Sequence, residues 1–195
     1  MNYLLIYAHS NPKSFTNAVY QSVYAELSLK GASIQVIDLY KDKFNPILYV
    51  DENHRRRDLF KDPETLIYRN KIERADHLIF IYPVWWHGFP AILKGFIDRV
   101  ISSEFAYSFK NKNKDALFPE GLLSDKKISC FYTLDAPSLV AFLDPGWLSI
   151  KYTIFKYCGF KQVERYYLSN LKHLDDKKRR EWLLKCRKIV RTFKN

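Results

Sequence analysis

Two tryptophans and a histidine stand side by side at residues 85–87, between an apolar run and a segment that favours a helix. Residues 77–82 are β-prone and stop at Pro83, and Pro90 stands where a helix takes its first residue. In an open α/β sheet such a turn lies at the carboxyl ends of the strands, where ligands collect if the strand order reverses nearby. A planar aromatic ligand could therefore lie along these rings. Aromatic side chains that merely cap the sheet are the alternative.

A hydroxyl-rich loop occupies residues 9–17, between a short apolar run and a helical pattern that ends at Lys30 and Gly31. Ser14 is the natural N-cap of that helix. The start of a helix presents unpaired backbone N–H groups and the positive end of the helix dipole, so this loop suits a phosphate. The loop contains no glycine, so it is neither a Walker loop nor a dinucleotide fingerprint. A plain capped helix is the alternative.

Strand-like and helix-like patterns alternate along the chain, which indicates a parallel sheet with right-handed crossovers. A polar stretch at 103–125 is too long for an idle connection, and residues 133–147 are expected to form a loop. With 195 residues and a hydrophobic fraction of 47%, residues 1–195 are expected to form one domain. Strands are expected at 3–8, 33–39, 77–82, 127–133 and 163–168. Helices are expected at 15–30, 62–75 and 90–101, in a stretch that ends at 157, and in a last stretch that begins near 175.

No segment reads as membrane-spanning. The longest stretch without Asp, Glu, Lys or Arg near the centre, His77–Leu93, contains two prolines and two histidines. The opening run at 3–8 has no basic residue before it and no small-residue cleavage pattern after it. It is therefore interpreted as a buried strand and not as a signal peptide, and a cytoplasmic location is expected.

The cysteines, Cys130, Cys158 and Cys186, are widely spaced and lack a C-x-x-C pair, which argues against a disulfide framework and a structural zinc site. The histidines are scattered without a pair at ligand spacing, so no metal site is expected.

The formal net charge of +11 raises the question of an anionic partner. Nucleic-acid binding through the basic C-terminal helix is a rival hypothesis, but such helices usually present a solvated face, and no nucleic-acid partner is expected. A basic run at 54–57 is interpreted as a solvated loop or a helix start.

Taken together, the loop at 9–17 and the segment 82–100 resemble the flavodoxin-like NAD(P)H:quinone oxidoreductases, the DT-diaphorase family with its short bacterial members. The shared motifs are A-H-S-x3-S-F near the start, P-x-x-W-x-G-x-P-A-I-L-K-G in the centre, D-R-V-x3-E-F-A-Y after it, and C-G-F at Cys158–Phe160. The resemblance implies an α/β, flavodoxin-like fold. Its five-stranded parallel sheet would have the order 2-1-3-4-5, with helices on both faces.

The resemblance also implies a bound FMN or FAD. Its phosphate or pyrophosphate would lie at the first loop and its isoalloxazine ring against the central turn, with backbone N–H groups of that turn and of the Thr133 loop at the polar edge of the ring. In a homodimer, two aromatic side chains would roof the substrate pocket of the neighbouring subunit. The implied positions are His9, Ser14, Phe15 and Thr16 for the phosphate, Pro83, Val84, Trp85, Trp86, His87 and Thr133 for the ring, and Tyr107 and Phe109 for the substrate pocket.

Two departures from DT-diaphorase concern the surroundings of the flavin. Tyr132-Thr133-Leu134-Asp135 stands where DT-diaphorase carries Thr-Thr-Gly-Gly. A Tyr and a His of that enzyme also have no clear match in this chain: Val140 falls near the position of the Tyr, and Asp144–Trp147 near the position of the His. The resulting hypothesis is a two-electron, ping-pong reductase. NADPH or NADH gives a hydride to flavin N5 and leaves, and a quinone or similar planar acceptor replaces it. A flavin-bearing electron carrier or accessory protein with little turnover is the alternative.

Overall fold

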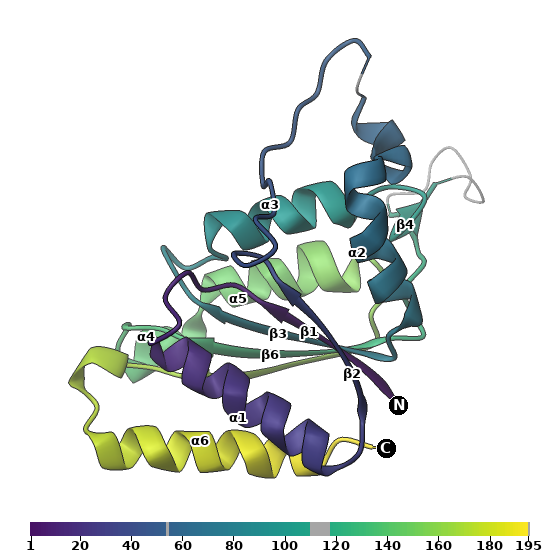
Figure 1. The fold of residues 1–195 in the computed structure, drawn as a ribbon. Coiled ribbons are helices and arrows are strands. Elements are labelled where there is room, and N and C mark those ends of the chain that lie inside the picture. The colour runs from purple at the N-terminus through teal and green to yellow at the C-terminus, as the bar shows by residue number, and fades with distance from the viewer. Residues whose placement is uncertain (54, 110–117, 195) are drawn as a thin grey trace.

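Five parallel strands form the centre of the computed structural model, which describes residues 1–53, 55–109 and 118–194 (Figure 1). Their order across the sheet is β2-β1-β3-β6-β7, while β4 and β5 form a separate antiparallel pair. Counting only the strands of the main sheet, the order is 2-1-3-4-5, and this prediction is confirmed. The strands are β1 (Asn2–Tyr7), β2 (Ser33–Asp38), β3 (His77–Pro83), β4 (Tyr107–Ser108), β5 (Glu120–Gly121), β6 (Lys127–Thr133) and β7 (Gln162–Leu168).

The inner strands are covered on both faces, which explains their nearly continuous apolar sequences. Every residue of β3 is buried, and β6 is buried from its second residue onward. The edge strand β2 fully buries only Ile37. The strands therefore lie where the hydrophobic pattern predicts them.

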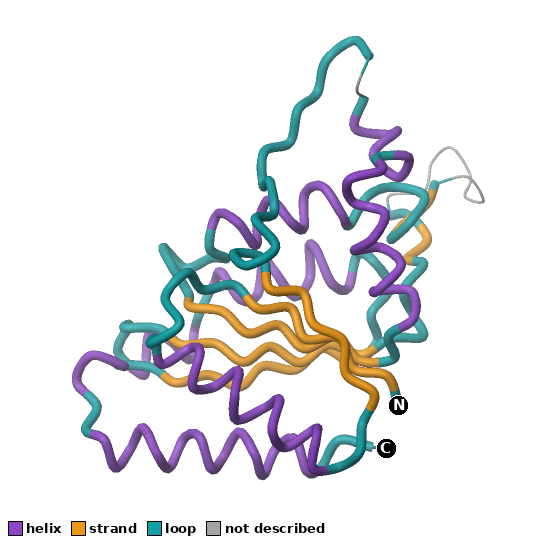
Figure 2. The backbone as a smooth tube through the Cα atoms, in the orientation of Figure 1, coloured by secondary structure: helices purple, strands orange, loops and turns teal. Residues whose placement is uncertain are grey.

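Helices cover both faces of the sheet (Figures 1 and 2). On one face α6 packs beside α1, and Arg191 of α6 lies 2.6 Å from the buried Glu26 carboxylate of α1. The opposite face carries α2, α3 and α5, and α5 continues into the π-helix η2. The longer helices are α1 (Phe15–Leu29), α2 (Pro63–Arg74), α3 (Ala91–Val100) and α6 (Asp176–Arg191), and the shorter ones are η1 (Arg56–Lys61), α4 (Ser138–Leu143), α5 (Pro145–Ser149), η2 (Ile150–Lys156) and η3 (Leu171–His173).

Two short helices, α4 and α5, begin within the segment 133–147, for which a loop was expected. That expectation was wrong because residues 138–143 are apolar almost throughout, so α4 has no visible helical periodicity. Asp144 then caps α5 by accepting a hydrogen bond from the Trp147 N–H at 3.1 Å. The start of α3 also differs slightly from the expected position. Pro90 is the N-cap, with an extended ψ of 147°, and the helix itself begins one residue later.

Several smaller predictions are also settled by the structure. All three cysteines are buried and free. The basic run at 54–57 opens η1, although His54 itself lies outside the described residues. Within the described ranges no helix combines the length and the apolar character that crossing a membrane requires.

The buried His77 makes the stability of the fold sensitive to acid. Its Nε2 lies 2.9 Å from the Ser129 hydroxyl, and its ring packs between Tyr3 and Phe193. Burial lowers the pKa of His77 to about 4, and the nearby Lys127 ammonium acts in the same direction. The unfolded chain therefore binds a proton at His77 more readily than the folded chain does.

We expect the free energy of unfolding to decrease by about 2 kcal/mol through His77 between about pH 7 and pH 5. The contribution is present above the unfolded-state pKa and is lost as the pH falls towards the folded-state value. Urea unfolding at both pH values measures it, with His77→Gln as the comparison because glutamine does not titrate. An equal pH dependence in the two proteins would contradict this assignment.

Candidate functional site

The first loop (residues 9–17) and the aromatic turn (residues 85–88) lie together at the carboxyl edge of the sheet. The chain passes from β1 outward to β2 and then returns to β3 on the other side of β1, so the strand order reverses between β1 and β3. The Thr16 hydroxyl of α1 lies 3.1 Å from the Thr133 hydroxyl at the end of β6, and both residues are buried. This contact joins the start of α1 to the strand beside the aromatic turn.

The first loop satisfies several of its own backbone donors and leaves two at the start of α1 without a partner among the described residues. Ser14 is the N-cap of α1 and accepts from the Asn17 N–H at 3.1 Å, while its own N–H donates to the Asn11 carbonyl. Within the described part of the chain, no acceptor takes the N–H groups of Phe15 or Thr16. Two donors at the positive end of a fifteen-residue helix are thus available to an anion.

His9 connects the first loop to the aromatic turn. Its Nδ1 accepts a hydrogen bond from the Asn11 N–H at 3.0 Å, so the proton of the neutral ring is on Nε2. The centroids of the His9 and Trp85 rings are 6.2 Å apart in an edge-on arrangement. Burial lowers the pKa of His9, which favours the neutral ring as an N–H donor.

The aromatic turn is a tight hairpin with left-handed backbone at both central residues. Trp85 and Gly88 exchange hydrogen bonds of 3.2 and 3.0 Å, and φ is +49° at Trp86 and +55° at His87. These angles define a type I′ turn, which glycine and asparagine favour and which is strained for tryptophan and histidine. The Trp86 side chain is fully exposed. A strained turn that presents an exposed indole is typical of a ligand site.

The residues flanking the turn hold it in place with their backbone groups. Pro83 ends β3 and is buried, and the Val84 N–H donates to the Thr133 carbonyl at 2.8 Å. The Leu134 N–H donates to Leu168 of β7 at 3.0 Å. These N–H groups are therefore engaged within the protein. The N–H groups of Trp86 and His87 have no acceptor within the described part of the chain.

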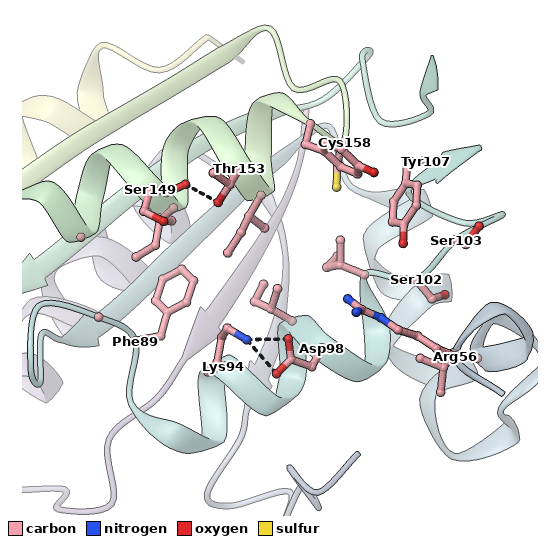
Figure 3. A pocket seen from close by; sticks show the side chains of 18 of the residues that line it. Arg56, Phe89, Lys94, Asp98, Ser102, Ser103, Tyr107, Ser149, Thr153 and Cys158 are labelled. Atoms are coloured by element: carbon pink, nitrogen blue, oxygen red, sulfur yellow. Dashed lines mark hydrogen bonds and ion pairs between the residues drawn. The ribbon is translucent and has the colours of Figure 1, made fainter. Parts of the chain in front are cut away.

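A cavity of about 1020 Å³ opens beside the turn, between α3 and η2 (Figure 3). Residues 85–89, Tyr107 and Phe109 belong to its lining, and Phe89 and Tyr107 lie towards opposite ends of it in Figure 3. The Tyr107 and Phe109 rings meet edge-on at 6.4 Å, and Tyr107 also packs edge-on against Tyr157 of η2 at 5.0 Å. The structure thus places Trp85, Trp86, His87, Tyr107 and Phe109 in one cavity, whereas His9, Ser14, Phe15 and Thr16 lie outside its lining.

Asp144 is a member of the site that the sequence analysis noted only by position. Its buried carboxylate accepts from the Tyr132 hydroxyl at 3.0 Å and lies 3.5 Å from the Arg165 guanidinium and 4.0 Å from Nδ1 of His87. Burial is the main cause that raises the pKa of Tyr132, so this phenol stays protonated and donates. The Asp-Pro pair at a helix start was the available signal, because Asp favours the N-cap and Pro the first turn.

An open parallel sheet of order 2-1-3-4-5, with a helix start and an aromatic turn at its switch point, defines a flavodoxin-like protein. Agreement with this class extends beyond the geometry. The family model described as a flavodoxin-like fold matches residues 1–189.

Three known proteins identify the family more closely. An uncharacterized NAD(P)H oxidoreductase of Haemophilus influenzae is 33% identical over 92% of this chain and 89% of its own length. NAD(P)H dehydrogenase [quinone] 1 of Cavia porcellus is 35% identical over 64% of this chain, and the match spans half of that protein. The crystal structure of Smu.1420 from Streptococcus mutans superposes with a TM-score of 0.91 at 39% identity, covering 99% of this chain and 100% of that one. The chain belongs to the flavodoxin-like NAD(P)H:quinone oxidoreductase family, as its motifs predict.

Proposed function

We propose that this chain binds a flavin and passes a hydride from NADPH or NADH to a quinone or a similar planar acceptor. The observation that carries the proposal is the meeting of a donor-rich helix start and a strained aromatic turn at the switch point of the sheet. Membership of the family, with relatives named NAD(P)H oxidoreductase and quinone dehydrogenase, supports it. When bound, the flavin would supply the hydride chemistry, which protein side chains cannot provide.

The donor set at the first loop fits the anionic tail of FMN or FAD. The free N–H groups of Phe15 and Thr16 and the dipole of α1 favour a phosphate oxygen, and the Nε2–H of His9 can donate from the side of the turn. The Ser14 hydroxyl oxygen accepts from Asn17, and its O–H is the donor that this side chain could offer to a phosphate oxygen. These groups hold and orient the tail and take no part in the redox step.

The aromatic turn fits the ring of a flavin. Its central N–H groups, at Trp86 and His87, are the free donors that can reach a polar ring edge where negative charge develops. Pro83, Val84 and Thr133 fix the start of the turn against β6, and the exposed face of Trp85 offers a flat surface. The chain therefore contributes binding, orientation and charge stabilisation.

The cavity beside the turn is the proposed place for donor and acceptor in alternation. Its aromatic residues 85–89 suit a nicotinamide or quinone ring, and Ile97, Ile101 and Ile154 add apolar wall to the same cavity. Because both molecules would use one cavity, the nicotinamide must leave before the acceptor enters, which is the basis of the ping-pong scheme. No acid–base pair is required in this scheme.

We further propose a homodimer in which Tyr107 and Phe109 roof the cavity of the neighbouring copy. Phe109 is 48% exposed, and the rings of this pair stand at the open end of the cavity, where a second chain can approach. We expect light scattering to give twice the chain mass of 23.2 kDa. A monomer would remove this role from both residues.

The function is tested by purifying the protein, adding FMN or FAD, and following the flavin absorption band. We expect NADPH or NADH to bleach the band and a benzoquinone to restore it, and mass spectrometry of the released flavin to identify which flavin the protein retains. A protein that takes up neither flavin would refute the proposal. A flavin-loaded protein that is bleached but turns over no quinone would instead be an electron carrier or accessory protein.

A further inference from the structure

Reduction of a quinone consumes a proton as well as a hydride. The hydride, with its electron pair, converts the quinone into a hydroquinone anion, and an oxygen of that anion must take up one proton to give the neutral product. Hydride transfer itself needs no acid–base pair, so the proton comes either from water or from an acid in the cavity. The described lining of the cavity contains one histidine, His87. Histidine is the side chain that gains and loses a proton near neutral pH.

Several other proton-bearing groups of the lining are poorly suited to this task. Lys94 Nζ is held by the two carboxylate oxygens of Asp98 at 2.6 and 2.8 Å. Burial raises the pKa of the Tyr157 phenol, and it raises the pKa of the Cys158 thiol to about 12. Among these groups, His87 is the one that exchanges a proton readily at neutral pH.

His87 faces a buried carboxylate. Its Nδ1 lies 4.0 Å from Oδ1 of Asp144, whose side chain is only 3% exposed. The other oxygen, Oδ2, accepts from the Tyr132 hydroxyl at 3.0 Å and lies 3.5 Å from the Arg165 guanidinium. Oδ1 accepts from the Trp147 N–H at 3.1 Å and is the oxygen that remains for His87. A carboxylate beside one ring nitrogen favours the proton there, which leaves Nε2 for a ligand.

The rest of the imidazole has no partner in the protein. The His87 side chain is 49% exposed, and no described residue forms a hydrogen bond with Nε2. Its backbone is left-handed with φ +55°, a conformation that glycine or asparagine would adopt with less strain. The His87 carbonyl also lies against Gly146 of α5, where a Cβ atom would overlap it, so the turn and Asp144 are held together. A strained position that carries a histidine points to a use for its imidazole.

We infer that His87 donates the proton that completes reduction of the acceptor, and that Asp144 is the positioning residue that orients its ring. The inference rests on the proposed function, because the cavity that His87 lines is the place given there to the acceptor.

The proton transfer balances as follows from the two ring nitrogens. The Nε2–H bond of the His87 imidazolium breaks and the proton joins the oxygen of the hydroquinone anion, while Nδ1 keeps its proton towards Asp144. A solvent proton then restores the imidazolium. The quinone has gained one hydride and one proton. Both residues belong to one chain, so the pair does not depend on the second copy of the proposed homodimer.

The test compares an acceptor that takes up protons with one that does not. The wild type, His87→Gln and His87→Asn are assayed with NADPH or NADH and with either a benzoquinone or ferricyanide, which accepts electrons without a proton. We expect kcat/KM for the benzoquinone to fall about ten- to a hundredfold in both variants, and kcat/KM for ferricyanide to stay within about threefold. Both variants keep the backbone N–H, and asparagine also suits the turn, so strain in the turn would not explain such a selective loss.

Asp144→Asn tests the positioning role, because it keeps the shape of the side chain and an oxygen for the Trp147 N–H but removes the charge. We expect kcat/KM for the benzoquinone to fall about tenfold, again with little change for ferricyanide. Nitrogen-15 NMR of the flavin-free protein gives a readout without turnover. We expect the neutral His87 ring to carry its proton on Nδ1 in the wild type and to lose this preference in Asp144→Asn.

His173→Gln is the matched control for loss of a histidine, since His173 lies on the exposed turn η3 and outside the cavity lining. It should leave both assays unchanged. An unchanged kcat/KM for the benzoquinone in the His87 variants, or equal losses with both acceptors, would overturn the inference and leave the proposed function standing. A ring proton on Nε2 in the wild type would overturn the role of Asp144. A protein that takes up no flavin would refute the proposed function, and the inference with it.

Discussion

Gly146→Ala should weaken flavin binding about ten- to a hundredfold. A Cβ atom at Gly146 would overlap the carbonyl oxygen of His87, so the aromatic turn would have to move away from the start of α5. The turn has little freedom to do so, because Trp86 and His87 already hold left-handed backbone angles. Overpacking of this kind usually costs about 1–3 kcal/mol, and the loss falls on the surface that we assign to the flavin ring.

Gly88→Ala is the matched control within the same turn. A Cβ atom there meets only the carbonyl oxygens of Trp85 and Trp86, each at 3.9 Å, which is an ordinary contact. We expect its flavin affinity to stay within about threefold of the wild type, since a shift of less than about 0.7 kcal/mol is typical of a tolerated surface change. Titration of flavin fluorescence measures both variants. Equal flavin affinities in the two variants would show that the contact between Gly146 of α5 and His87 does not keep the aromatic turn in its position.

The largest expected loss of stability comes from Arg99→Met. This buried guanidinium of α3 donates to the Asn45 carbonyl at 2.7 Å and to the carboxylates of Asp62 and Glu64 at 2.8 Å each. Asp62 is the N-cap of α2, so Arg99 ties the start of that helix and the segment at Asn45 to α3. Removal of the guanidinium leaves the Asp62 carboxylate, whose side chain is only 19% exposed, and the Asn45 carbonyl without this donor, and we expect unfolding to become easier by about 3 kcal/mol.

Urea unfolding measures this loss, with an unchanged dependence on urea concentration as the sign that only stability has changed. Lys94→Met is the control on the same helix, because Lys94 and Asp98 form an exposed pair one turn apart. Such pairs contribute about 0.5 kcal/mol or less. If both variants lost the same stability, Arg99 would not have the anchoring role described here.

The strands and helices were predictable because they depend on local patterns that recur along the whole chain, whereas the order 2-1-3-4-5 of the sheet was implied by the family resemblance. Apolar runs predicted the positions of the strands. Ser14, Asp62 and Asp175 predicted where three helices begin, because short polar side chains accept hydrogen bonds from the first N–H groups of a helix. The aromatic motif at residues 85–88 was also visible, because proline residues bracket it and its residue types are unusual.

Features that depend on long-range contacts were not predictable. Tryptophan and histidine do not favour a type I′ turn, so the residue types at 86 and 87 do not predict the geometry of the aromatic turn. The close contact between Gly146 and the His87 carbonyl is likewise seen only in the structure. The Asp144 carboxylate meets Tyr132 and Arg165 from separate strands, a contact that no local pattern records. The basic run at 54–57 was interpreted as a solvated loop or a helix start, and the place of Arg56 and Arg57 in the cavity lining could not be predicted because it depends on the fold.

The most direct test is a crystal structure of the protein with bound flavin. We expect the phosphate on the N–H groups of Phe15 and Thr16, and the ring against the aromatic turn with its polar edge at the N–H groups of Trp86 and His87. A flavin bound elsewhere, with the start of α1 free of any anion, would contradict the assignment of the site.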